Sequence, residues 1–257
     1  MAETTARTEG PDWSAKAPVW VELWAHLAGP AREAVAEATG IGPGTRVLDV
    51  GCGSGEFCAL AVGRGATAAG IDAAEGMVEI ARRRLPDADL RVGPMEELPW
   101  PDASFDVVSG FNSFQFAANL VGALREAGRV ARPGGLVAIC NWALYRELFE
   151  LFDVLREALA PEAEDEPPGP DRPRVGEPGV LESLATAAGL EPGAAREVNV
   201  PYEAPDQDTL VRALMMEAPG ADPADVRRVL DGAGERFRRP DGSYRFENRF
   251  RFLIATA

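Results

Sequence analysis

The stretch from Val47 to Phe57 constrains the fold of this chain more than any other part of its sequence. It reads VLDVGCGSGEF, an apolar run followed by glycines at alternate positions, Gly51, Gly53 and Gly55. The apolar run predicts a buried strand, and the residues after the last glycine have the composition of a helix. Backbone N–H groups converge in a turn between a strand and a helix, and glycines let a ligand come close. The sequence therefore predicts an anion or nucleotide site at this turn.

Strand and helix patterns alternate along most of the chain. Predicted strands lie at 46–50, 66–72, 89–93, 105–110, 135–142 and 197–202, and predicted helices at 56–63, 73–85, 119–131, 144–159, 180–188, 206–217 and 222–232. An Asp-Gly turn precedes a last strand whose alternate residues would share one face: Tyr244, Phe246, Asn248, Phe250, Phe252 and Ile254. Such alternation predicts an α/β fold with a parallel sheet covered by helices on both faces.

The length of 257 residues suits one large domain with insertions. We expect residues 1–40 to form an N-terminal helical lid and residues 41–257 the main domain, with cap insertions at about 144–179 and 204–240. Residues 1–12 are small, polar and unpatterned, which predicts a loose segment ahead of two short helices. The segment 161–179 is rich in proline and acidic residues, which predicts an exposed loop.

Composition narrows the classes of partner. Lys and Arg number 26 against 41 Asp and Glu, so the net charge is -15 and would repel phosphate backbones and anionic lipids. Cys52, Cys58 and Cys140 lack metal-ligand spacing, which predicts free thiols in a reducing cytoplasm and no metal site. There is no charged-then-apolar leader and no run of about 18 apolar residues. We therefore expect a cytoplasmic protein with no nucleic-acid or membrane partner. We take it to be a monomer or homodimer that acts on a small molecule.

The residues around the glycines indicate which nucleotide would bind. The dinucleotide fingerprint is Gly-x-Gly-x-x-Gly, but here the third glycine comes one residue early and Glu56 follows it, which would repel a pyrophosphate. Asp49, just before the glycines, favours a positive charge on the ligand. Asp72 ends the second predicted strand, where a carboxylate can accept both hydroxyls of a ribose. S-adenosylmethionine has a ribose, an ammonium group and a sulfonium, and no pyrophosphate, so it meets all of these conditions.

Several segments in order resemble the motifs of class I S-adenosylmethionine-dependent methyltransferases. The resemblance is to the small-molecule group called methyltransferase type 11 or ubiquinone/menaquinone-biosynthesis-like. It covers about residues 41–142 and rests on residues 47–57, 70–84, 96–108, 110–116 and 124–139. It implies a Rossmann-like, doubly wound, mostly parallel seven-stranded sheet with an antiparallel C-terminal strand and helical cap insertions. It also implies methyl transfer from S-adenosylmethionine, with S-adenosylhomocysteine as the product.

The same resemblance implies a set of cofactor-binding residues. The glycine turn and Asp49 would hold the methionine portion, Asp72 the ribose, and four further residues the adenine, while three residues after the fourth strand would line the space toward the acceptor. In chain order the set is Asp49, Gly51, Cys52, Gly53, Gly55, Asp72, Ala73, Met77, Met95, Glu96, Phe111, Asn112 and Gln115. Many relatives have an aspartate at the position of Pro94, and it bonds the adenine amino group. Either Glu96 replaces that aspartate or the contact is missing.

The catalytic and acceptor-binding residues stay open at this level. If a general base is used, candidates are His26, Tyr145 and Tyr202; candidate acceptor-binding residues are Trp20, Trp24, Met215 and Met216. Each of these also fits a purely structural role. Because no Ser-His-Asp set or Cys-His pair is evident, we expect proximity and alignment to lead the mechanism.

The functional hypothesis is methyl transfer to a small organic acceptor such as a natural product. One alternative is an S-adenosylmethionine-binding enzyme of the same fold that catalyses cyclisation or isomerisation without methylating. The other is a nicotinamide enzyme or a non-catalytic binding module.

Overall fold

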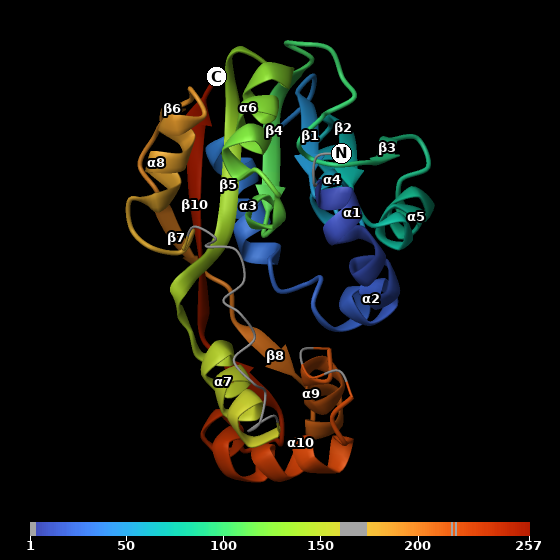
Figure 1. Cartoon of the computed structure of the whole chain (residues 1–257), viewed down its shortest axis with the longest axis vertical. Helices are drawn as coiled ribbons and strands as arrows, with labels where there is room; N and C mark the ends of the chain where they lie inside the picture. Colours follow the sequence, from blue (N-terminus) through green and yellow to red (C-terminus); the bar gives the residue numbers. More distant parts are fainter. Residues whose placement is uncertain (1–3, 160–173, 217, 219) are drawn as a thin grey trace.

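The centre of the computed structural model is a mixed sheet with helices on both faces (Figure 1). The structure describes residues 4–159, 174–216, 218 and 220–257. The strand order is β3-β2-β1-β4-β5-β10-β6, and β7 also pairs with β10. The strands are β1 (Arg46–Val50), β2 (Thr67–Asp72), β3 (Asp89–Val92), β4 (Phe105–Phe111), β5 (Ala131–Arg146), β6 (Glu191–Pro192), β7 (Arg196–Asn199) and β10 (Asn248–Thr256).

The expected sheet type is confirmed, with one difference in strand number. Strands β1 to β5 are parallel, and β10 is antiparallel to β5, β6 and β7. The sheet has eight strands instead of seven because two short strands, β6 and β7, share the position beside β10. The outer strand is interrupted after Pro192, whose ring nitrogen has no hydrogen to donate to a neighbouring strand.

Helices cover both faces of the sheet because the strands carry apolar side chains on both faces. Val47 packs in a core with α3 (Gly29–Ala38), α4 (Glu56–Gly63) and α5 (Glu75–Arg84), whereas its neighbour Leu48 packs in a second core with α6 (Leu120–Val130) and α8 (Val180–Ala187). Both residues are fully buried. This double burial is the arrangement expected for a parallel sheet.

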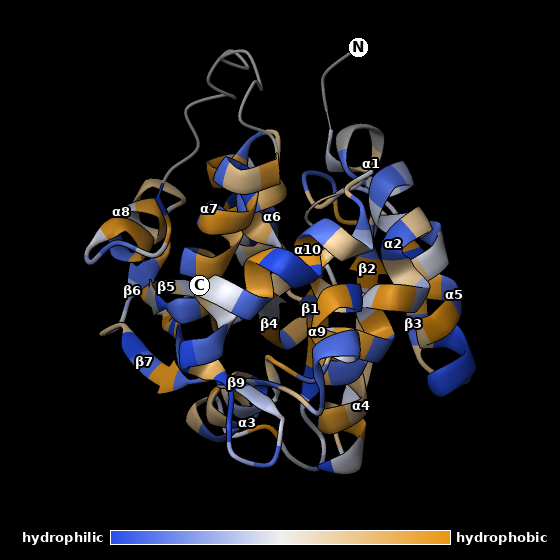
Figure 2. Cartoon of the chain, turned by 90° about the horizontal axis from the view of Figure 1, so that it is seen from below, coloured by the Kyte–Doolittle hydropathy of each residue, from blue (hydrophilic) through white to orange (hydrophobic). Residues whose placement is uncertain are grey.

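A smaller group of elements lies beyond the lower end of the sheet in Figure 1. It contains α7 (Glu147–Leu159), α9 (Gln207–Leu214), α10 (Pro223–Val229), a π-helical turn (Leu230–Gly234), a 3-10 turn (Glu235–Phe237) and a second sheet of β8 (Tyr202–Ala204) and β9 (Tyr244–Phe246). We call this group the lower lobe. Viewed from below, α7, α9 and α10 lie across the end of the sheet (Figure 2). Leu151, Leu210 and Val226 of these helices belong to the same buried core as Val47, so the lobe and the sheet share one core.

The N-terminal segment differs from the expectation of a loose start. Residues 5–8 form α1 (Thr5–Thr8), and α2 runs from Gly10 to Leu23, with Pro18 inside it. A Cβ on Gly10 would lie 2.5 Å from the carbonyl oxygen of Ala73, so α2 packs directly on the start of α5. Such contacts with distant residues order a segment that has no apolar pattern of its own. Residues 1–3 lie outside the described part.

Other predicted elements are present with shifted ends. The predicted strand 197–202 is divided between β7 and β8, and the last predicted strand between β9 and β10, so each run serves two sheets. In β10 the alternate residues Phe250, Phe252 and Ile254 share one core as expected, and Leu253 and Ala255 between and after them are buried in the other core, so the strand is covered on both faces. The helix expected from residue 144 begins at Glu147 because β5 continues to Arg146. Of the expected loop 161–179, residues 161–173 lie outside the described part.

Among the helices that the structure describes, none has both the length and the apolar composition needed to cross a membrane.

Candidate functional site

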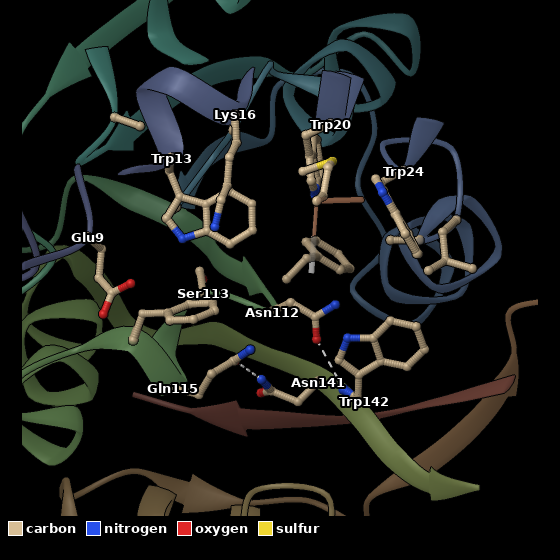
Figure 3. Close-up of a pocket in the computed structure, with 18 of the residues that line it drawn as sticks. Glu9, Trp13, Lys16, Trp20, Trp24, Asn112, Ser113, Gln115, Asn141 and Trp142 are labelled. Atoms are coloured by element: carbon tan, nitrogen blue, oxygen red, sulfur yellow. Dashed lines mark hydrogen bonds between the residues drawn. The ribbon is translucent and has the colours of Figure 1, made fainter. Parts of the chain in front are cut away.

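A cavity of about 1260 Å³ lies where the parallel strands end at their carboxyl side, between the sheet, α2 and the lower lobe (Figure 3). It exceeds the range of about 300–1,000 Å³ that is typical of a site for one small molecule. One end is lined by the glycine turn, Asp49, Asp72 and α2, and the other by side chains of β5, α7 and the segment after α9. The cavity therefore has room for two ligands side by side.

The glycine turn requires glycine for two different reasons. Gly51 has φ +72°, and a Cβ there would lie 2.2 Å from the Cβ of Ser113, so no side chain fits. Gly53 has φ +53°, and the atoms nearest to a Cβ there are ring carbons of Trp20 at 3.9 Å. Both glycines line the cavity. Because Gly53 has no side chain, the space between the turn and α2 stays open to a ligand.

The N–H groups of this turn are used within the protein, which corrects one sequence-based expectation. Gly51 and Cys52 both donate to the carbonyl of Ile71, at 2.7 and 3.0 Å, and Gly53 donates to Asp72 Oδ2 at 2.8 Å. The predicted convergence of free N–H groups on an anion is therefore wrong for these three residues. A turn without free donors at these positions is poorly suited to a pyrophosphate.

Asp49 is almost fully buried at the start of the turn. Its Oδ1 accepts a hydrogen bond of 2.8 Å from the Ser109 hydroxyl. Burial raises the pKa of Asp49 to about 7, although the Ser109 bond and nearby Arg32 favour the ionised form. A carboxyl group with this pKa changes its charge readily when a cation binds beside it.

Arg32 of α3 also lines the cavity, and the sequence analysis missed it. Its Nη1 donates to the carbonyl of Ala25 at 2.7 Å, and no carboxylate lies within ion-pair distance among the described residues. Burial lowers the pKa of this guanidinium. The signal in the sequence is a lone arginine between Ala31 and Val35 on the buried face of the helix. A buried cation without a carboxylate partner is costly unless a ligand neutralises it.

Asp72 stands at the end of β2 with its carboxylate held in place by the backbone. Oδ2 accepts from the N–H of Gly53 and Oδ1 from the N–H of Ala74, both at 2.8 Å. Burial raises the pKa of Asp72, and these two bonds act in the opposite direction. Each oxygen keeps an acceptor direction for a further donor. Of the predicted adenine residues, Ala73, Met77 and Met95 line the same part of the cavity.

Glu96 and Gly55 do not line the cavity, unlike the other residues of the predicted cofactor set. The carboxylate of Glu96 accepts hydrogen bonds from the hydroxyl of Thr5 at 2.6 Å and from the N–H of Ala118 at 2.8 Å. It therefore ties α1 to the main domain. Gly55 has φ +83° and precedes the first residue of α4.

A group of amide side chains meets where β4 ends beside the middle of β5 (Figure 3). Asn112 has φ +50°, rare for a residue with a side chain, and its Oδ1 accepts from the N–H of Trp142 at 3.1 Å. Asn141, which the sequence analysis also missed, donates from Nδ2 to Gln115 Oε1. The sequence indicates this residue only as the one polar side chain in the apolar predicted strand 135–142. Phe111 lines the cavity beside this group.

Two of the three candidate bases, His26 and Tyr202, are not brought into the cavity. His26 is exposed in the otherwise buried turn between α2 and α3, and its ring stacks on that of Tyr202 with centroids 5.8 Å apart. Tyr202 is buried against Trp24, with ring centroids 4.7 Å apart, and burial raises the pKa of its hydroxyl. Neither residue lines the cavity. The side chain of Tyr145 lies outside the described part.

Three of the four candidate acceptor-binding residues line the cavity. Trp20, Trp24 and Met216 line the cavity, whereas Met215 does not. All three cysteines are buried free thiols. In the ranges that the structure describes, no group of three or more His, Cys, Asp or Glu residues could hold a metal ion.

Comparison with known proteins agrees with this geometry. Residues 48–139 match the family model described as "Methyltransferase domain". The chain is similar to malonyl-[acyl-carrier protein] O-methyltransferase of Serratia marcescens, with 38% identity over 101 residues, 39% of this chain and 40% of that protein. It is similar to demethylmenaquinone methyltransferase of Beutenbergia cavernae, with 33% identity over 126 residues, 47% of this chain and 52% of that protein. The chain thus spans about half or less of the curated relatives it matches.

A solved structure extends the likeness of fold to nearly the whole chain. The [4+2]-cyclase SpnF has a TM-score of 0.64 at 22% identity, over 99% of this chain and 97% of that chain. At this identity the likeness concerns the fold alone. The family match lies at the centre of this shared fold, and residues 48–139 of the chain are similar to a methyltransferase domain.

Proposed function

We propose that the cavity binds S-adenosylmethionine and that the protein transfers its methyl group to a small organic acceptor. One observation carries this proposal: Asp49 and Arg32 stand at one end of the glycine turn, and the Asp72 carboxylate stands at the end of the next strand. The charged amino-acid tail of S-adenosylmethionine matches Asp49 and Arg32, and its ribose, which joins the tail to the adenine, matches Asp72.

The tail would lie where the two opposite charges stand. Arg32 is close enough to lower the pKa of Asp49, so both groups act on one region of the cavity. The ligand's ammonium would pair with Asp49 and its carboxylate with Arg32. Each of these buried charges would then gain the partner that it lacks in the described protein.

The nucleoside would lie along Asp72 and the apolar side chains beyond it. The Asp72 oxygens can each accept one ribose hydroxyl in addition to their backbone bonds. Ala73, Met77 and Met95 offer an apolar slot for the adenine. Because Glu96 is engaged by Thr5, we propose that adenine is held mainly by shape and the neighbouring backbone.

The protein's part in the chemistry is alignment. When bound, S-adenosylmethionine supplies an electrophilic methyl group on a sulfonium sulfur. Asn112, Gln115 and Asn141 form a fixed amide surface between this region and the rest of the cavity, and they would orient the acceptor atom. The cavity-lining residues that the structure describes include no histidine or tyrosine. Holding two reactants in a near-attack geometry can lower the barrier by about 7–11 kcal/mol without a base.

The N-terminal helices would act as a lid, and the described parts of the segments 144–179 and 204–240 as a cap. Trp13 and Trp20 of α2 line the cavity (Figure 3), and ring carbons of Trp20 would lie 3.9 Å from a Cβ at Gly53. Glu22 of α2 pairs with Arg212 of α9 at 2.6 Å, which connects the lid to the lower lobe. A closed lid excludes water from the reacting groups.

The proposal is tested with S-adenosylhomocysteine, the product form of the cofactor. In calorimetry, Asp72→Asn should weaken its binding by about 30-fold, because two charge-assisted bonds to the ribose are lost. Asp87→Asn, at an exposed position, is the matched control and should bind like the wild type. Equal binding by wild type and Asp72→Asn would refute this placement of the ribose.

A second candidate is an enzyme that binds the cofactor but does not transfer its methyl group. The absence of a histidine or tyrosine from the described lining residues, together with the size of the cavity, suits a reaction driven by confinement. Release of S-adenosylhomocysteine in step with acceptor consumption supports the methyltransferase. Conversion of the acceptor without that release supports the alternative.

A further inference from the structure

The part of the cavity on the lower-lobe side is built mainly from aromatic rings. Trp142 lies edge-on to Phe149 and to Phe250, with ring centroids 5.1 and 4.7 Å apart. Phe152 contacts both Phe149 at 5.4 Å and Trp24 at 6.1 Å. We call these residues the aromatic wall: Trp24, Trp142, Phe149, Phe152 and Phe250. All five border the cavity; Phe250 is fully buried behind Trp142, and the other four offer an apolar surface to a ligand.

One cation stands at the edge of the aromatic wall. The guanidinium of Arg146, the last residue of β5, lies over the ring of Phe149 at 4.2 Å and lines the cavity. Within the described ranges no carboxylate lies within ion-pair distance of it, and Asp153 acts on it only at longer range. Burial lowers its pKa, which an anionic partner would reverse. An unpaired, half-buried arginine beside an apolar surface is suited to a planar anion such as a carboxylate.

The aromatic wall also contains an unused donor. The indole N–H of Trp24 is buried and has no hydrogen-bond partner among the described residues. Buried donors normally have a partner, and leaving one unpaired is unfavourable. An oxygen atom on a ligand that lies against this ring would satisfy it.

The strand geometry separates Arg146 from the amide group. In the strand register, Asn141 lies opposite Arg251 of β10 and Arg146 lies opposite Asn248. Five residues of β5 therefore face three of β10, because the register shifts between Trp142 and Arg146. Three residues of an antiparallel strand span about 10 Å, so the two backbone positions are about that far apart. Because the Arg146 guanidinium also lies over Phe149 of α7, we place an anion held by Arg146 and the atom beside the amide group at two different parts of the cavity.

From these contacts we propose that the acceptor is an aromatic or polycyclic acid. Its apolar body lies on the aromatic wall, its anionic group pairs with Arg146, and the methylated atom lies at its other end, near Asn141. This inference rests on the proposed function for the site of methylation. The binding of the acid by Arg146 and the aromatic wall does not depend on it.

The test uses two dyes with the same anilinonaphthalene body. One is 8-anilino-1-naphthalenesulfonate, which carries an anion, and the other is N-phenyl-1-naphthylamine, which does not. Both should bind the wild-type protein saturated with S-adenosylhomocysteine, with increased fluorescence. Arg146→Gln should weaken binding of the sulfonate about tenfold and leave the neutral dye within about twofold. Arg228→Gln, which removes an exposed arginine of α10, should leave both unchanged.

Further variants separate the possible outcomes. Phe152→Ala should weaken both dyes, and Arg146→Lys should keep part of the preference for the sulfonate; circular dichroism checks folding. Equal loss of both dyes in Arg146→Gln, or no loss of the sulfonate, would overturn the role of Arg146. Failure of both dyes to bind the wild type would overturn the role of the aromatic wall. Failure of S-adenosylhomocysteine to bind in calorimetry would instead refute the proposed function, and the dyes would then be titrated without it.

Discussion

The hydroxyl of Thr5 donates a hydrogen bond of 2.6 Å to the carboxylate of Glu96, which lies 91 residues away in the chain. The same carboxylate accepts from the N–H of Ala118. One acidic side chain therefore connects the first helix, the segment after β3 and the segment before α6. We infer that it helps to hold α1 and α2 over the cavity.

Removal of this carboxylate should loosen the lid. Glu96→Ala should speed hydrogen exchange of the backbone amides in α1 and α2 and weaken S-adenosylhomocysteine binding about fivefold, because closing the lid would lose its anchor. Glu97→Ala, at the exposed neighbouring position, is the control. Exchange rates that stay equal in the two variants would show that Glu96 does not anchor the lid.

The role of the open space at Gly53 can be tested by comparing an alanine variant there with one at Gly44, another glycine with positive φ. Gly53 and Gly44 have φ of +53° and +84°, and a Cβ at Gly44 would have no atom within 4 Å. Replacing either by alanine should lower the free energy of unfolding by about 1 kcal/mol. Only Gly53→Ala should also weaken S-adenosylhomocysteine binding, by tenfold or more, because its methyl group enters the cavity. Thermal unfolding and calorimetry on both variants measure the two effects, and equal affinities would contradict our placement of the ligand.

The pKa of Asp49, about 7, predicts a proton linked to binding. At pH 6 most of the ligand-free protein has Asp49 protonated, so pairing with an ammonium should release close to one proton. Affinity for S-adenosylhomocysteine should rise about tenfold from pH 5.5 to 7, a range in which an ordinary α-amino group stays protonated. Calorimetry in buffers of different ionisation enthalpy measures the proton. If Asp49→Asn keeps the same pH profile, Asp49 is not the linked group.

The same shift predicts how stability depends on pH. The pKa of Asp49 is raised in the folded state, so between about pH 4 and 7 the folded protein keeps a proton that the unfolded chain has lost. The contribution of Asp49 to the free energy of unfolding therefore falls as pH rises through this range and is level above it. Asp49→Asn should remove this slope in urea unfolding at a series of pH values.

Arg32 predicts opposite effects on stability and binding. Replacing a buried cation that has no carboxylate partner by an apolar side chain of similar length removes a desolvation cost. Arg32→Met should raise the free energy of unfolding by about 1 kcal/mol, or the melting temperature by about 2–4 °C, and weaken S-adenosylhomocysteine binding at least tenfold. A variant that is less stable and binds normally would show that Arg32 serves the fold.

Much of the fold follows from local patterns. Val47 and Leu48 are apolar neighbours in a five-residue strand, and this is the mark of a strand buried on both faces. The left-handed conformations of Gly51 and Gly53 follow from the same short stretch. These features could be predicted because the residues that determine them are adjacent in the chain.

The remainder depends on residues that are distant in sequence. Thr5 is ordered by Glu96, so the polar N-terminus could not be recognised as helical, and Glu96 could not be separated from the adenine set by position alone. Arg32 and Asn141 become candidate site residues only because α3 and β5 bring them to the same cavity. Sequence periodicity shows that such polar residues interrupt an apolar face, but it does not show what they face.

The most direct test of this account is a crystal structure with S-adenosylhomocysteine bound. We predict that its ribose hydroxyls contact Asp72 and that its amino-acid tail lies between Asp49 and Arg32, next to Gly53. An adenosyl group bound elsewhere, or a tail that contacts neither Asp49 nor Arg32, would contradict the account.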